Sequence, residues 1–301
     1  MTKFNLQSFL FALVLLIAVL INKPAAPMRA KPIVEVDLQD TSLVAVANLN
    51  ASIMAPIQSD LKPAPEIKAS AAIAKELFSP TVFFELNTDQ EWPIASLTKL
   101  MTAVVALEKI GGGQPITISE TAVATEGVSG NFNIGETYAV NDLVSALMGV
   151  SSNDAAAALA EFYFDSKQKD LANEMERKAK RLGMGNTRLT DSTGLSPLNQ
   201  STIGDLEKLV KYIFKQHPEI FAASRQKEVR IGNRLVMNIN KFADRPDFLG
   251  GKTGYTDEAN GNLISIFNYN EKPILIIVLG SDDRFRETEK LYDYFTAGSN
   301  Y

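Results

Sequence analysis

The sequence has no cysteine and only one histidine among its 301 residues. The absence of cysteine excludes thiol catalysis, disulfide bonds and cysteine-ligated metal sites. His217 lies in the segment Lys215-Gln216-His217-Pro218, which is typical of a surface turn. A single histidine in such a place argues against a Ser-His-Asp hydrolase and against a histidine-rich metal site. If the protein uses a nucleophile, we therefore expect its base to be a lysine.

A dense basic run is also missing. The chain carries 30 Lys and Arg residues against 35 Asp and Glu residues, a net charge of −5. This balance argues against a nucleic-acid partner. The hydrophobic share of 46% and the charged share of 22% are ordinary for a globular protein with a sizeable core. The length is that of one or two domains.

Long apolar runs are scarce, with one exception near the N-terminus. Residues 9–21 carry no charge and no strongly polar side chain, and they follow Lys3. Extended back to Phe4, the run would span about 27 Å as a helix, close to the thickness of a bilayer core. No clean small-x-small cleavage site follows it. We expect residues 1–22 to be a membrane anchor, or else a signal segment that is removed, and both versions export the rest of the chain.

The rest of the chain divides into a spacer and a folded body. Residues 23–66 contain repeated prolines and are expected to form a partly extended spacer. The body is expected to cover 67–301, with helices concentrated in a subdomain at about 97–225. Strands are predicted on both sides of that subdomain, at 70–74, 81–85, 227–231, 234–238, 249–256, 262–268 and 274–279, with a closing helix at 285–295. This order predicts an α+β fold with an antiparallel sheet, flanking helices and a helical subdomain.

The segment from Pro93 to Thr102 offers the first chemical motif. Apolar spacing predicts a helix from Leu97 to Ile110, with Ser96 at its start and Lys99 three residues further on. Positions three apart share one face of a helix, so the Lys99 amine can reach the Ser96 hydroxyl. A buried lysine with a lowered pKa can then remove the proton that a serine must lose to act as a nucleophile.

Taken alone, this motif is not specific. A chain of this length is expected to contain Ser-x-x-Lys about once by chance. The pattern occurs four times, at Ser59/Lys62, Ser96/Lys99, Ser166/Lys169 and Ser224/Lys227. Each pair by itself is better explained by a solvated helix or loop. Other motifs are needed to single out Ser96.

Two other motifs accompany it. Lys252-Thr253-Gly254 lies in a predicted glycine-flanked strand, where glycine lets a substrate backbone come close. Ser-x-Asn occurs twice, at Ser129-Gly130-Asn131 and at Ser151-Ser152-Asn153. The first occurrence falls in an irregular loop. The second lies between two predicted helices, where a side chain can point into a cleft, so we select Ser151 and Asn153.

With these three motifs in this order, the sequence resembles the penicillin-recognising serine enzymes. The surrounding residues are similar to those of one family within them, the D-alanyl-D-alanine carboxypeptidases, or low-molecular-weight penicillin-binding proteins. The similar segments are Pro93–Ala103, Ser152–Ala156, Arg181–Met184, Thr193–Leu195 and Gly251–Thr256. The resemblance covers about 67–295. It implies a β-lactamase/transpeptidase-like fold, action on bacterial peptidoglycan, and β-lactam antibiotics as covalent inhibitors.

The resemblance also implies a role for each motif residue. Ser96 would attack the carbonyl of the penultimate D-alanine, with Lys99 as its base. Lys99 would be kept neutral by burial and by the nearby charge of Lys252. Ser151 would pass a proton to the leaving amine, and Asn153 would orient Lys99 and the substrate amide.

The third motif is assigned to substrate binding. Lys252 and Thr253, followed by Gly254, would hold the terminal carboxylate of the substrate. The backbone N–H groups of Ser96 and Tyr255 would form an oxyanion hole. No metal or cofactor is expected.

Several alternatives remain open. A D,D-endopeptidase that cuts peptide cross-links would use the same residues. A β-lactamase is disfavoured because no Glu-x-x-x-Asn loop of the class A type is present. A non-catalytic wall-binding protein is disfavoured because all three motifs are intact. The chain stops soon after the closing helix, so we expect the family's frequent C-terminal β-domain and membrane-binding tail to be absent. The enzyme is then expected at the extracytoplasmic face of the membrane, held by residues 1–22, or secreted.

Overall fold

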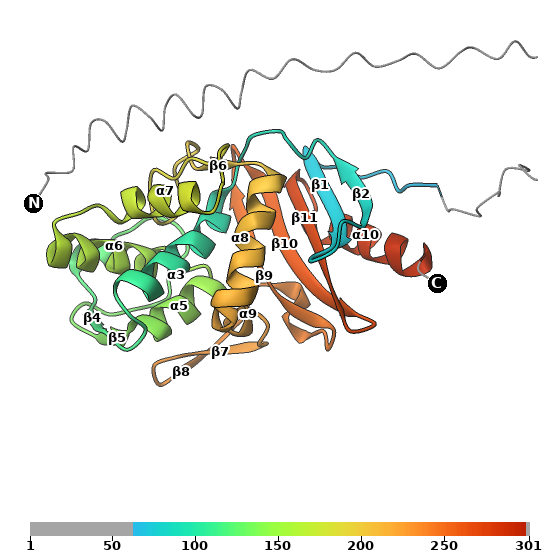
Figure 1. The fold of residues 1–301 in the computed structure, drawn as a ribbon. Coiled ribbons are helices and arrows are strands. Elements are labelled where there is room, and N and C mark those ends of the chain that lie inside the picture. Colours follow the sequence, from blue (N-terminus) through green and yellow to red (C-terminus); the bar gives the residue numbers. More distant parts are fainter. Residues whose placement is uncertain (1–62, 299–301) are drawn as a thin grey trace, which may run out of the picture. The chain divides into compact units, whose positions relative to one another are not determined.

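The computed structural model describes residues 63–298, drawn in colour in Figure 1. The predictions for residues 1–22 and for most of the spacer lie outside this range. Within 63–298, no helix combines the length and the apolar character needed to cross a membrane.

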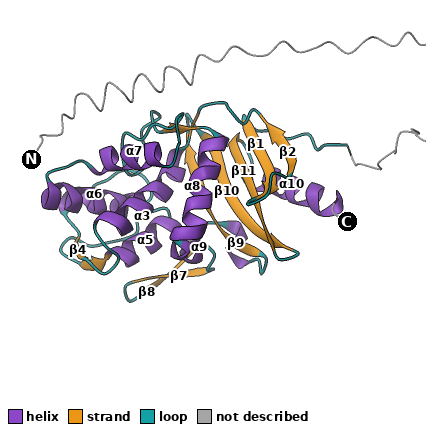
Figure 2. Cartoon of the chain, viewed as in Figure 1, coloured by secondary structure: helices purple, strands orange, loops and turns teal. Residues whose placement is uncertain are grey.

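A five-stranded antiparallel sheet forms one half of the described structure. Its strand order is β2 (Val82–Leu86), β1 (Ala71–Glu76), β11 (Lys272–Ser281), β10 (Asn260–Tyr269) and β9 (Phe248–Thr256). The first strands of the described chain thus pair with the last, and β9 lies at an edge. Figure 2 shows the strands between helices on both faces.

Both faces of the sheet are buried, and alternate residues along each strand serve the two faces. On one face, Ile264 and Ile277 join the core shared with the helical region. On the other face, Phe267 and Val278 pack with residues of α10 (Arg284–Gly298). In Figure 1, α8 (Ile203–Gln216) crosses in front of the sheet and α10 lies behind it. Burial on both faces explains why the central strands read as nearly continuous apolar runs.

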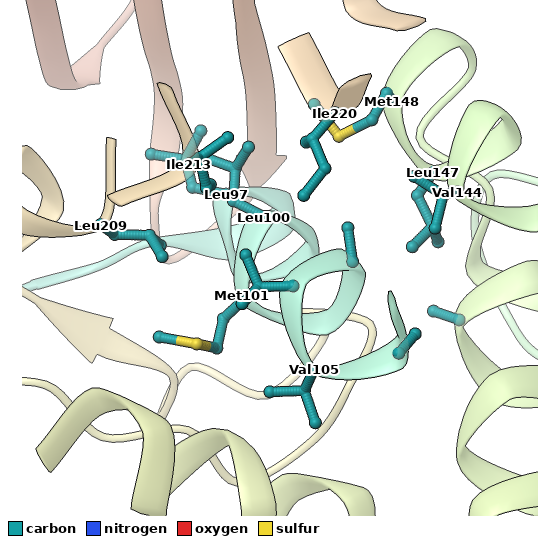
Figure 3. Close-up of a cluster of buried hydrophobic side chains, with 14 of the residues drawn as sticks. Leu97, Leu100, Met101, Val105, Val144, Leu147, Met148, Leu209, Ile213 and Ile220 are labelled. Carbon is teal, nitrogen blue, oxygen red and sulfur yellow. The ribbon is translucent and has the colours of Figure 1, made fainter. Parts of the chain in front are cut away.

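The other half is a group of helices between β3 (Trp92–Pro93) and β7 (Glu228–Ile231). Its helices are η1 (Ala95–Leu97), α3 (Thr98–Lys109), α4 (Glu120–Val123), α5 (Val140–Gly149), α6 (Asn153–Lys167), α7 (Leu171–Arg181), α8 and α9 (Pro218–Ser224). The α3 helix is buried on nearly all sides. Figure 3 shows Leu100, Met101 and Val105 surrounded by apolar side chains of α5, α8 and α9. This packing fixes the helix that begins directly after Ser96.

The predicted α+β organisation is present, with some differences in detail. The strands predicted at 227–231 and 234–238 do not join the main sheet. They form a separate hairpin, β7 with β8 (Arg234–Met237), which packs against α5 through the close contact of Val229 with Gly149. Several short elements were not predicted: α4, α9, η2 (Lys241–Asp244) and the two-stranded pairs of β3 with β6 (Gln200–Ser201) and β4 (Pro115–Thr117) with β5 (Thr137–Ala139).

Candidate active site

The three motif segments meet beside the edge strand β9. Ser96 lies in η1, Ser151 and Ser152 lie between α5 and α6, and Lys252 lies in β9. A Cβ atom on Gly254 would come within 2.9 Å of the Ile94 carbonyl oxygen and 3.2 Å of the Ser96 nitrogen. Glycine at this position therefore lets β9 pass directly against the backbone of η1.

Ser96 is held in a tight backbone elbow. Ala95, directly before it, has a φ of 47°, a left-handed conformation that is rare for a residue with a Cβ. Gly194 supports this elbow, since a Cβ on it would lie 2.1 Å from the Ala95 carbonyl oxygen. The elbow leaves Ser96 partly exposed while its neighbours on both sides are buried. Strained backbone of this kind is concentrated at functional sites.

Lys99 is fully buried and has three hydrogen-bond partners. Its Nζ lies 2.8 Å from Ser96 Oγ, 2.7 Å from Asn153 Oδ1 and 2.5 Å from the Thr193 carbonyl oxygen. Burial lowers the pKa of Lys99 to about 7, although the negative charges of Asp191 and Asp154 act to raise it. Near neutral pH a substantial fraction of this amine is therefore uncharged.

Lys252 is the second buried lysine of the site. Its Nζ donates hydrogen bonds to Ser151 Oγ at 2.8 Å and to the Thr253 carbonyl oxygen at 2.7 Å. Burial, followed by the nearby charges of Lys99 and Arg284, lowers the pKa of Lys252 well below its ordinary value. For Lys99, the expected effect of burial on the pKa is present, whereas the charges that act on it are those of Asp191 and Asp154 and not the expected charge of Lys252.

The remaining motif residues line the same region. Thr253 is buried, whereas the Tyr255 side chain is 59% exposed and its hydroxyl lies 3.3 Å from Asp257 Oδ1. Ser151 adopts a φ of 60°, so the residue that meets Lys252 is in a left-handed conformation like Ala95. Neither unusual conformation was predicted, because neither residue type favours it.

Sequence reasoning missed two charged residues beside the site. The Asp191 carboxylate accepts backbone hydrogen bonds from Thr193, Gly194 and Ser196, and so it shapes the loop that presents the Thr193 carbonyl to Lys99. Its signal was available, since the neighbouring Thr193–Leu195 had already been singled out. Arg284, at the start of α10, donates from Nη1 to the Gly254 carbonyl oxygen at 3.1 Å. No local pattern distinguishes Arg284 from other arginines.

The other Ser-x-x-Lys pairs have different surroundings. Ser224 is buried, donates to the Phe221 carbonyl and accepts the Gly251 N–H, while Lys227 pairs with Asp244. Ser166 bonds to a carbonyl of its own helix. Ser59 lies outside the described residues. Within 63–298, no cluster of three or more Asp, Glu or His side chains is arranged to hold a metal ion.

The comparisons with known proteins agree with the motifs. A family model described as D-alanyl-D-alanine carboxypeptidase matches residues 58–283. A D-alanyl-D-alanine endopeptidase of Pseudomonas aeruginosa is 31% identical over 247 residues, which cover 77% of this chain and 79% of that protein. The D-alanyl-D-alanine carboxypeptidase DacC of Escherichia coli is 33% identical over 250 residues, which cover 76% of this chain and 61% of DacC.

The fold is also found among solved structures. Penicillin-binding protein D2 of Listeria monocytogenes, in its ampicillin-bound form, matches with a TM-score of 0.66 and 29% identity. The match covers 77% of this chain and 99% of that chain. The predicted β-lactamase/transpeptidase-like fold is thereby confirmed, and the chain belongs to the D-alanyl-D-alanine carboxypeptidase family.

Proposed function

We propose that the protein is a serine-type D-alanyl-D-alanine carboxypeptidase that removes the terminal D-alanine from peptidoglycan stem peptides through an acyl-enzyme on Ser96. The observation that carries this proposal is the 2.8 Å distance from the Lys99 amine to Ser96 Oγ, together with a Lys99 pKa of about 7. A neutral amine next to the hydroxyl is the base that a serine nucleophile needs.

The hydrogen-bond partners of Lys99 leave the lone pair of its amine free to accept the proton of Ser96. A neutral amine has two N–H donors and one lone pair. Asn153 Oδ1 and the Thr193 carbonyl can only accept, so they take the two N–H groups. The lone pair then faces Ser96 Oγ. In this arrangement Asn153 orients the base rather than competing with it.

The first half-reaction follows from this geometry. Ser96 Oγ bonds to the carbonyl carbon of the penultimate D-alanine while its proton moves to Lys99 Nζ. The negative oxygen of the tetrahedral intermediate is stabilised by the backbone N–H groups of Ser96 and Tyr255, where losing one donor typically costs about 3–4 kcal/mol. The C–N bond then breaks, and the proton that Lys99 took from Ser96 is returned to the leaving amine through Ser151, which Lys252 holds in place.

We assign the binding of the substrate's terminal carboxylate to the part of the site that carries Lys252 and Arg284. Lys252 has a strongly lowered pKa in the absence of an anion, and a bound carboxylate would favour its charged form. Arg284 remains charged at all working pH values and lies against Gly254. Lys252, Thr253 and Arg284 together would hold the terminal carboxylate. Water then attacks the acyl-enzyme, returns Ser96 to its free form and releases the shortened peptide.

An endopeptidase that cuts peptide cross-links is the second candidate, because two relatives from Pseudomonas aeruginosa and Escherichia coli carry that name. Mass spectrometry after incubation with pentapeptide muropeptides and with cross-linked dimers tests both candidates. We expect loss of one D-alanine from the pentapeptide, and no loss with Ser96→Ala. Conversion of dimers to monomers with the pentapeptide left intact would establish the endopeptidase instead.

The location and the inhibitors belong to the same proposal. The protein would act at the extracytoplasmic face of the membrane, with residues 1–22 as anchor, 23–66 as spacer and 67–301 as catalytic domain. β-Lactams would acylate Ser96 because their ring amide can be attacked in the same way as the scissile amide bond. This attack needs only the nucleophile, the base and the oxyanion hole. Fractionation of cells tests the anchor, since an anchored enzyme stays with the membrane at high salt and is released by detergent.

A further inference from the structure

The side chain of Asp154 is completely buried beside the site, and no role in the reaction has been assigned to it so far. Its carboxylate accepts hydrogen bonds from Ser129 Oγ at 2.6 Å and from the Gly130 N–H at 2.8 and 3.0 Å. It also accepts from the hydroxyl of Ser152 and, at 3.0 Å, from the N–H of Ala155. Within 63–298 the carboxylate forms no ion pair, so its charge is balanced only by these neutral donors.

These contacts join two segments that meet at Asn153. Ser129 and Gly130 belong to the loop that follows α4, and Ser152 and Ala155 belong to the start of α6. The same loop holds Asn153 directly: the Val128 carbonyl accepts the Asn153 N–H at 2.7 Å, and the Glu126 carbonyl accepts from Asn153 Nδ2 at 2.7 Å. With Nδ2 engaged there, Oδ1 is directed to Lys99 Nζ. The Asn153 amide therefore depends on a loop that Asp154 anchors.

The charge of Asp154 also acts on Lys99. Two charged groups act on the pKa of this amine: Asp154 from α6 and Asp191 from the loop before β6. Lys252 of β9 faces it as well, and its own pKa is lowered by the charges of Lys99 and of Arg284 from α10. The two carboxylates favour the protonated form of Lys99 and oppose the effect of burial. The Asp191 carboxylate accepts a hydrogen bond from the Thr193 N–H, in the loop that contacts Lys99. The Asp154 carboxylate accepts one from the Gly130 N–H, in the loop that contacts Asn153.

We propose that Asp154 is a positioning residue of this active site, which holds Asn153 against Lys99 through the loop at 126–131 and sets the protonation of Lys99 through its own negative charge. This inference rests on the proposed function, because it assumes that Lys99 is the base for Ser96. In this proposal the first turn of α6, which carries Asn153 and Asp154, both orients Lys99 and affects its protonation.

The test is the pH dependence of acylation by a fluorescent penicillin, measured with the full-length protein as the second-order rate constant. Asp154→Asn keeps the shape of the side chain and removes its charge. We expect acylation to fall about tenfold, because the Asn153 amide loses its fixed position. We also expect the acid limb of the profile to move to lower pH by about half a unit or more, because Lys99 loses a negative neighbour. Asp154→Ser removes the same charge and should move the limb in the same direction.

Ser129→Ala is the matched control, since it deletes one hydrogen bond to the same carboxylate and leaves the charge in place. Its acid limb should coincide with that of the unsubstituted protein. The inference is overturned if the charge-removing variants are folded by thermal melting and keep the original limb, or if Ser129→Ala moves the limb equally. Failure of the unsubstituted protein to label at Ser96, or a flat profile, would instead overturn the proposed function.

Discussion

Two lysines buried in one site set the chemistry at the scale of single residues. Both have lowered pKa values, and burial is the largest cause in each case. They differ in their partners: Lys99 contacts Ser96 and Asn153, and Lys252 contacts Ser151. The two hydroxyls of the site are thus each paired with an amine of their own, and the amines are suited to different proton transfers.

The pKa of Lys99 leads to a prediction about pH. Acylation requires the neutral amine, so the second-order rate constant for penicillin should rise with pH and level off above a midpoint near 7. Below the midpoint each unit of pH should cost about tenfold, since the neutral fraction falls by that factor. The measurement is acylation rate between pH 5 and 9. A rate that falls on raising the pH from 5 to 7 would rule out Lys99 as the base.

The identity of the nucleophile gives a second prediction. Ser96→Ala should abolish labelling by fluorescent penicillin, whereas Ser59→Ala, Ser166→Ala and Ser224→Ala should retain it. Ser224→Ala has an additional effect, because it leaves the buried N–H of Gly251 without its partner and should cost about 1–3 kcal/mol of stability. Gel fluorescence and a melting curve measure the two effects separately. Labelling that persists in Ser96→Ala would refute the assignment.

A third prediction separates the two lysines. Arginine stays protonated in proteins, so Lys99→Arg should lose acylation. Lys252→Arg should keep partial activity, because a cation near the substrate carboxylate is retained. Acylation rates for both variants and the unsubstituted protein provide the comparison. A near-normal rate for Lys99→Arg would show that this side chain does not act as the base.

At the scale of elements, the site depends on how closely loops and strands approach η1. Gly194, with a φ of 83°, packs against the carbonyl of Ala95, and Gly254 of β9 packs against the nitrogen of Ser96. Both contacts are too close for a side chain. The elbow that carries Ser96 is therefore clamped between the 191–196 loop and the sheet edge, which keeps its strained conformation in place.

The fourth prediction follows from this clamp. In Gly194→Ala the new methyl group would overlap the Ala95 carbonyl, and the left-handed backbone would add about 1–2 kcal/mol. We expect a lower melting temperature and at least a tenfold loss of penicillin acylation. Gly113→Ala is the control, since a Cβ there meets nothing within 4 Å and the backbone φ is not positive. Acylation unchanged in Gly194→Ala would show that the elbow tolerates a shift.

The elements that were predictable from sequence are those with strong periodicity. The helix after Ser96 and the strands at 249–256, 262–268 and 274–279 were placed to within a few residues, because apolar patterns and glycines mark them. The two strands of the hairpin β7–β8 were predicted, but their separate pairing was not, since alternation of apolar residues shows that a strand exists and not which strand it pairs with. The contacts of Asp154, Asp191 and Arg284 depend on tertiary structure. Asp154 and Asp191 lie in or next to segments that the sequence singled out, whereas no local pattern distinguishes Arg284.

At the scale of the whole molecule, the described residues contain no carboxylate hydrogen-bonded to Ser96 or Lys99. Acylation has its base in Lys99, whereas none of these hydrogen bonds offers a carboxylate base for a water that attacks the acyl-enzyme. General base catalysis is typically worth about 10²–10⁴-fold. A peptide acyl-enzyme avoids part of this loss, because its D-alanine diffuses away and leaves room for water.

The fifth prediction is that penicillin is released slowly. A chase of the labelled protein with unlabelled drug at neutral pH should leave the label in place for minutes or longer. Turnover of a D-alanyl-D-alanine peptide by the same preparation controls for loss of active protein. Loss of the label within a second would favour a β-lactamase.

The sheet joins the first and last strands of the described chain, and this has a consequence for how the molecule folds. Lys252 meets Ser151 across 101 positions of sequence, and β1 pairs with β11 from the opposite end. Contacts between such distant segments form slowly, because long loops must close before any of them is stabilised. No early, locally folded fragment contains both lysines. We therefore expect the chain to become reactive only late in folding, so that covalent binding of penicillin would report on molecules that have completed it.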